Sequence, residues 1–199
     1  TEEDAVVRLD LESVPYIAQL RLDLDEVQRR QEVHLGAITS TGLLHALWSI
    51  PETGVSTADV APMDNVTLAG AAVGLIEARG ETLQRIYRPP GEVLLLAARR
   101  SAPEAAISKA MRVPPIFQRV AMWNASSDVK RRDPWLFRLA LRSGLGMIEF
   151  DHSSRARAVQ SPVEAASGVP AVYRWLVAEI AFHSWLHAQT ATPPAEPSA

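Results

Sequence analysis

Apolar and charged positions alternate along the first part of the chain. Residues 8–14 and 21–27 repeat one pattern, Arg-Leu-Asp-Leu-acid-x-Val, in which apolar and charged residues alternate over the first five positions, as on a half-buried strand. This alternation predicts a hairpin that turns near Pro15. The alternative is a helix that begins at Pro15 and carries its apolar residues on one stripe, which holds Ile17, Leu20, Leu24 and Val27. We favour the helix.

Helix caps, chain breakers and apolar spacing predict six elements between residues 25 and 98. They are helices over 26–32, 40–50 and 66–78, a short helix over 57–63 that Ser56 caps, and strands over 82–88 and 92–98. The two strands flank the turn Pro89-Pro90-Gly91, so they predict a hairpin. The third helix is expected to bury Leu68, Ala72, Leu75 and Ile76.

The motifs in residues 40–98 follow the order of a known DNA-binding family. A leucine-rich helix, Leu43-Leu44-His45-Ala46-Leu47-Trp48, precedes Thr57-Ala58-Asp59, and Glu77-Ala78-Arg79-Gly80 precedes a hairpin that carries Arg85 and Arg88. The segment resembles the winged helix-turn-helix domain of bacterial regulators. The resemblance implies a third helix that enters the major groove of DNA, with the hairpin as a wing.

The expected third helix departs from the pattern of that family. Beyond Asn65 and Thr67 it offers few side chains that could read base edges, and Gly70 and Gly74 would let another helix approach closely. We therefore expect protein packing or phosphate contacts rather than base readout. The candidate nucleic-acid-binding residues are Thr67, Arg85, Arg88, Arg99, Arg100, Lys130, Arg131 and Arg132.

The second half of the chain reads as helical. The predicted elements are helices over 101–111, 114–123, 135–143 and 170–187, and one strand over 145–150. Residues 152–169 are expected to be a surface connection, and residues 190–199 a disordered tail. The expected fold is mainly α with a small β-hairpin, and its segments are an extension (1–39), a winged-helix-like module (40–100), a helical module (101–189) and the tail (190–199).

Composition supports one or two modest cores. The chain has 199 residues, of which 47% are hydrophobic and 22% charged. It has no cysteine, which excludes disulfides and zinc fingers. No stretch approaches the roughly 20 apolar residues of a spanning helix, and the acidic start is unlike a secretory signal. We therefore expect a cytoplasmic protein that does not contact membranes.

Charge is distributed unevenly under the net charge of −3. Residues 98–157 hold twelve basic and five acidic side chains, whereas residues 1–97 are acidic. The basic segment could attract phosphates or an acidic protein. Trp123 and Trp135 flank its loop at 124–132, where they could stack on nucleic-acid bases, although we expect both in the core.

One constellation in the sequence could hold a metal. Glu179, His183 and His187 are each four residues apart in a predicted helix, and Glu149, Asp151 or His152 could complete the ligand set. A solvent-facing polar stripe is the simpler interpretation. Because no catalytic motif occurs in the chain, we expect no catalytic residue, no cofactor and no bound metal.

The leading function is a non-enzymatic DNA-associated regulator or accessory subunit. The alternative is a protein-interaction adaptor in a larger assembly that binds an acidic partner through the wing and the basic loop. A metal-dependent His/Glu enzyme is the third hypothesis. The helix at 170–188 is either the central strut of the second half or an oligomer contact, and self-association through it or through the small-residue helix is expected, as in a homodimer.

Overall fold

The computed structural model describes residues 1–61, 74–125, 133–151, 153–163 and 171–191. They form a mixed α/β fold with a six-stranded sheet and a three-stranded sheet, so the prediction of a mainly α protein is wrong. The chain divides into two compact units, each built from separated segments. Unit 1 holds Thr1–Asp4, Arg21–Glu92 and Pro170–Ala199, and unit 2 holds Ala5–Leu20 and Val93–Val169.

The N-terminal alternation forms strands and not the favoured helix. Strands β1 (Glu2–Leu11) and β2 (Val14–Asp23) are neighbours in the six-stranded sheet. Glu12 and Ser13 join them with φ angles of 51° and 64°, the positive values that a tight type I′ hairpin turn requires. Alternate residues of the two strands are buried. They are Val7 and Leu9 in β1, and Tyr16, Ala18, Leu20 and Leu22 in β2. The turn at Glu12 and Ser13 precedes Pro15, which is the second residue of β2.

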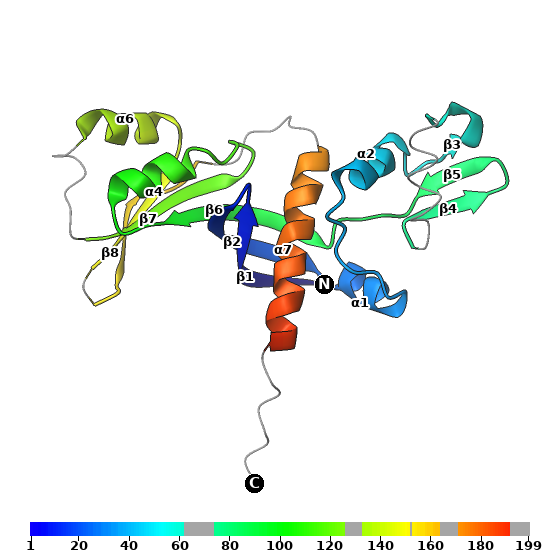
Figure 1. Cartoon of the computed structure of the whole chain (residues 1–199), viewed down its shortest axis with the longest axis horizontal. Helices are drawn as coiled ribbons and strands as arrows, with labels where there is room; N and C mark the ends of the chain where they lie inside the picture. The colour runs from blue at the N-terminus through cyan, green and yellow to red at the C-terminus, as the bar shows by residue number, and fades with distance from the viewer. Residues whose placement is uncertain (62–73, 126–132, 152, 164–170, 192–199) are drawn as a thin grey trace, which may run out of the picture. The chain divides into compact units, whose positions relative to one another are not determined.

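Unit 2 contains two strand–helix–strand crossovers (Figure 1). Strands β6 (Gly91–Arg99), β7 (Gln118–Asn124) and β8 (Gly146–Phe150) are parallel neighbours, linked by helices α4 (Pro103–Ala110) and α6 (Pro134–Arg142). Both crossovers advance in the same direction along the sheet, so the right-handed rule puts α4 and α6 on one face, where they contact each other. Strand β9 (Ala156–Gln160) pairs antiparallel with β8.

Two predictions in this unit are wrong. The helix expected over 114–123 is strand β7, because the buried Val120, Ala121 and Trp123 fit a central strand between two parallel neighbours. The surface connection expected over 152–169 contains strand β9. Helices α4 and α6 and strand β8 confirm the other predictions, and the Asp133 carboxylate caps α6 by accepting from the backbone N–H of Leu136.

Unit 1 confirms two of the expected helices. They are α1 (Leu24–Glu32) and α2 (Thr41–Ser49), and Ser40 caps α2 by accepting from Leu43. Ser56 caps only a single 3-10 turn, η1 (Thr57–Asp59). Residues 62–73, most of the expected third helix, lie outside the described part of the chain, and its predicted end belongs to strand β4 (Ile76–Arg79).

The expected wing is not a hairpin of residues 82–88 and 92–98. Strand β5 (Thr82–Arg85) pairs instead with β4 and with the short β3 (Val55–Ser56), which gives the order β3-β5-β4. Residues 91–99 form β6 of the other sheet. Gly80 has a φ of 62° in the tight link between β4 and β5, so this link is the turn of the hairpin.

Helix α7 (Ala171–Ala191) packs into unit 1 with the earlier segments of the chain, and not into unit 2 with the residues that precede it. It packs against α2, and its Trp175 makes edge contacts with Trp48 and Tyr87 at ring-centroid distances of 5.3 and 5.0 Å. The surrounding core holds Leu44, Leu47, Ile50, Leu75 and Val172. The long apolar helix therefore packs as a strut within unit 1, and the oligomer contact expected for it stays a prediction. None of the described helices is long and apolar enough to cross a membrane.

Candidate functional site

The cations expected to bind phosphate have different surroundings. The side chain of Arg85 is 11% exposed, bonds to Glu52 at 3.0 Å and stacks its guanidinium 4.9 Å from the Trp175 ring centroid. Arg88 is exposed. Both belong to unit 1, whereas Arg99 and Arg100 belong to unit 2. Thr67, Lys130, Arg131 and Arg132 lie outside the described residues.

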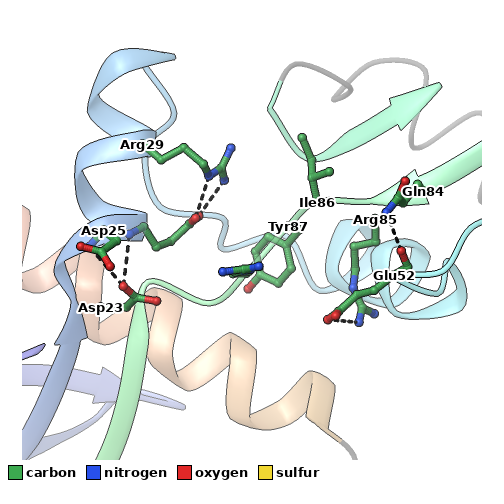
Figure 2. A pocket seen from close by; sticks show the side chains of 10 residues that line it. Asp23, Asp25, Arg29, Glu52, Gln84, Arg85, Ile86 and Tyr87 are labelled. Carbon is green, nitrogen blue, oxygen red and sulfur yellow. Dashed lines mark hydrogen bonds and ion pairs between the residues drawn. The ribbon is translucent and has the colours of Figure 1, made fainter. Parts of the chain in front are cut away.

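A pocket of unit 1 is lined by α1, Glu52 and residues 84–88 (Figure 2). Four of its charged side chains form two ion pairs within the pocket. Arg29 donates two hydrogen bonds of 2.7 Å to Glu26, and this bonding raises the pKa of Arg29. Arg85 on the opposite wall bonds to Glu52. No serine or histidine lines the pocket, so its described side chains offer polar binding rather than nucleophilic chemistry.

A smaller pocket in unit 2 gathers arginines. Arg8, Arg99 and Arg100 line it together with Tyr16, and none of the ion pairs found in the described structure involves these three arginines. Arg99 holds its guanidinium 5.2 Å from the Phe150 ring centroid. Burial lowers the pKa of the nearby Lys109, and the charge of Arg100 lowers it further, against the opposing charge of Asp10. The structure thus joins two predicted cations, Arg99 and Arg100, in an electropositive pocket.

Helix α6 presents a large exposed apolar side chain within the basic segment 98–157. Trp135 is 65% exposed, so the expectation that it lies in the core is wrong, whereas Trp123 is 2% exposed and confirms it. Arg138, Leu141 and Arg142 are exposed beside it. Their spacing places these four side chains within an arc of about 120° on the helix. We call Trp135, Arg138, Leu141 and Arg142 the α6 face.

The α6 face exists because its helix buries little. Ala140 is its one fully buried residue, and Leu136, Phe137 and Leu139 are half-buried. Helix α6 carries no acidic residue, so its two exposed arginines have no carboxylate neighbour on the same helix. The sequence analysis missed this face, although the cap Asp133-Pro134 fixes the start of the helix and the spacing from Trp135 to Arg142 could have revealed it.

The three residues of the expected metal stripe, Glu179, His183 and His187, have different surroundings. Glu179 is fully buried and accepts hydrogen bonds from Arg30, Tyr87 and the backbone of Ile38. His183 and His187 are exposed. A cluster of three or more metal-ligating side chains is not found among the described residues.

The residues proposed to complete the metal stripe have other roles. The Glu149 carboxylate accepts from the Trp123 indole, and the Asp151 carboxylate accepts from the backbone of Ser153 and Arg155. His152 lies outside the described residues. A His/Glu metalloenzyme site therefore gains no support from the side chains that are described.

No protein-family model, no curated protein and no solved structure matches this chain.

Proposed function

We propose that this chain is a protein-interaction adaptor that binds an acidic partner through the α6 face. The observation that carries the proposal is the exposure of Trp135 beside Arg138 and Arg142 on a helix without acidic residues. Tryptophan and arginine are the residues most enriched at the energetic centres of protein interfaces. The exposed Leu141 adds apolar area, which a protein partner can cover.

The partner is expected to present carboxylates around an apolar contact. Arg138 and Arg142 would face these carboxylates, because like charges on the partner would oppose docking. The arginine pocket of Arg8, Arg99 and Arg100 adds to the positive charge of the same unit. Charge complementarity of this kind increases the association rate and gives a salt-dependent affinity.

The competing proposal is a regulator that contacts DNA phosphates. Among its eight candidate residues, Arg85 is held by Glu52 and Trp175, and four lie outside the described chain. The apolar content of the α6 face favours a protein over a phosphate backbone. For this reason the adaptor is the proposed function, and nucleic-acid binding is an outcome of its test.

The test places a photo-crosslinking amino acid at position 135 in the native cell and identifies the crosslinked protein. The purified partner is then titrated with the wild-type chain and with Trp135→Ala and Arg142→Ala variants. We expect an acidic partner whose affinity falls by about tenfold or more in each variant, which is the loss typical of a residue at the centre of an interface. Arg112→Ala, which changes an exposed arginine of the same unit outside the α6 face, is the matched control.

A fluorescence-anisotropy titration with duplex and single-stranded oligonucleotides completes the test. Repeating it at about 50 and 200 mM salt measures the contribution of phosphate contacts. Absence of binding supports the adaptor. Steeply salt-dependent oligonucleotide binding, together with a crosslinked protein whose affinity Trp135→Ala does not change, would overturn it in favour of the DNA-associated regulator.

A further inference from the structure

His183 and His187 form a close pair on the exposed side of α7. They are one helical turn apart, and their Nε2 atoms lie 3.1 Å from each other. The rings stand at 74° to one another with their centroids 4.3 Å apart. Both side chains are exposed, so solvent reaches the two nitrogens.

This spacing matches the geometry of a metal chelate. Imidazole nitrogens bind zinc at roughly 2.0–2.1 Å. Two nitrogens 3.1 Å apart at that bond length subtend an angle of roughly 100° at the metal. The angle lies between the roughly 90° of square-planar or octahedral sites and the roughly 109° of tetrahedral sites. The same distance also corresponds to a hydrogen bond between the two rings, which a bound metal would replace.

We propose that His183 and His187 form a two-histidine site for a borderline-soft divalent transition metal. Their Nε2 atoms are the ligands, and each Nδ1 keeps its proton, because a metal-bound imidazole is neutral. Glu179, four residues earlier, is not a ligand, since its carboxylate is buried and bonded to Arg30 and Tyr87. Water or a group from outside the described chain fills the remaining coordination positions.

The ligand set determines the order of metal preference. Imidazole suits copper, nickel and zinc, whereas calcium and magnesium prefer oxygen ligands. A site with no imposed geometry follows the general series, so Cu²⁺ binds more tightly than Ni²⁺ or Zn²⁺. The two histidines also bridge one turn near the end of α7, so a bound metal stabilises the C-terminal turns of that helix.

The test titrates Cu²⁺ and Ni²⁺ separately into the full chain in a buffer that does not coordinate metals. Calorimetry gives the affinity and the stoichiometry, and electron paramagnetic resonance of the Cu²⁺ complex counts the coordinating nitrogens. We expect one ion per chain with two imidazole nitrogens. His183→Ala or His187→Ala should weaken binding by about 10²-fold, because the second imidazole adds through its high effective concentration.

Two control variants separate the pair from isolated histidines. His45→Ala removes an exposed histidine from helix α2 and should leave binding unchanged. The double variant His187→Ala/Ala188→His keeps the number of histidines but turns the second imidazole by about 100° around the helix. It should bind as weakly as His187→Ala alone.

The proposal is overturned by either of two results. One is Cu²⁺ binding with the wild-type affinity in His187→Ala or in the spacing variant. The other is a resonance spectrum that shows fewer than two imidazole nitrogens in the wild-type chain. Denaturant unfolding of each variant in the absence of metal verifies that the exposed substitutions leave the fold intact.

Discussion

The Arg30 guanidinium and the Glu179 carboxylate form a bidentate ion pair between residues that are 149 positions apart in the chain. Their two hydrogen bonds measure 3.0 and 2.8 Å, and the side chains are 1% and 0% exposed. Glu26 on α1 bonds to the other edge of Arg30 at 2.8 Å. This pair links α1 to α7 within unit 1.

Removing one member of this pair should destabilise the protein strongly. Burial alone would lower the pKa of Arg30, but Glu179 and Glu26 outweigh it and raise that pKa, so the guanidinium stays charged. Arg30→Met leaves the buried Glu179 carboxylate without its guanidinium partner, and Glu179→Leu leaves the buried Arg30 with Glu26 as its remaining carboxylate partner. We expect each to lower the free energy of unfolding by about 3–5 kcal/mol, measured by urea denaturation.

The double variant Arg30→Met/Glu179→Leu tests whether the two side chains act as a pair. Its loss of unfolding free energy should be smaller than the sum of the losses in the two single variants. In the double variant neither the Arg30 guanidinium nor the Glu179 carboxylate is left buried without the other. Arg79→Met removes the solvent-exposed partner of the Arg79–Glu77 pair and should leave the unfolding midpoint nearly unchanged. Additive losses in the double variant would contradict the coupling.

Tyr87 should make stability decrease at alkaline pH. Burial is the main reason that the pKa of its phenol is raised, and the charge of Glu179, which accepts the phenol hydrogen bond at 2.9 Å, raises it further. The neutral phenol is therefore favoured in the folded chain. Its stabilising contribution is present below about pH 10, where an unfolded tyrosine titrates, and is lost as pH rises above that value.

The Tyr87→Phe variant isolates this contribution. At neutral pH it should cost about 1 kcal/mol, because Glu179 keeps its bonds to Arg30 and Ile38. Unfolding measured from about pH 8 to 11 should show the difference between wild type and variant shrinking above about pH 10. A difference that stays constant over this range would show that Tyr87 does not titrate differently in the two states.

Lys109 should have the opposite pH dependence. Its ammonium donates to the Pro15 carbonyl and lies 4.9 Å from the Tyr16 ring centroid, but burial and then Arg100 lower its pKa. The unfolded chain therefore holds this proton more firmly than the folded chain does. Stability should rise with pH between the lowered pKa and about 10.4, where an unfolded lysine titrates.

A comparison with Lys109→Met measures this effect. The methionine removes the titrating group. The free energy of unfolding of the wild type should therefore increase relative to that of the variant as pH approaches about 10.4. Denaturant unfolding at several pH values measures the gain. A decrease in the unfolding free energy of the wild type relative to the variant over the same pH range would contradict the lowered pKa of Lys109.

Local signals predicted the elements whose ends carry caps. Ser40 and Asp133 accept from the first turns of α2 and α6 as their positions suggested. In contrast, Pro114-Pro115 looked like the start of a helix, and β7 follows it instead. Its apolar residues are buried by neighbouring strands that are distant in sequence, and that contact overrides the local preference.

The candidate sites show the same limit. The spacing of Glu179, His183 and His187 correctly placed the two histidines together. Each step of four residues turns by about 40° around the helix. The spacing alone could not show that Glu179, at one end of this stripe, lies in the core. Its partner Arg30 could not be identified because nothing local in the sequence relates the two positions.

Two glycines should respond oppositely to the same substitution. A Cβ at Gly91 would collide with the backbone carbonyl of Arg21, where the start of β6 meets the end of β2. A Cβ at Gly42, in the first turn of α2, would point into open space. We expect Gly91→Ala to destabilise the protein by about 1–3 kcal/mol through backbone overpacking. Gly42→Ala should stabilise it by about 0.5–1 kcal/mol, because alanine favours the helix and restricts the unfolded chain.

Urea unfolding of both variants beside the wild type measures these changes. The substituted residue is the same, so the difference in sign comes only from the surroundings of each glycine. Equal effects at the two positions would mean that the β2 and β6 backbones can separate at Gly91 without cost. Opposite signs would establish that the close approach of Arg21 requires a glycine there, which in turn fixes where β6 begins.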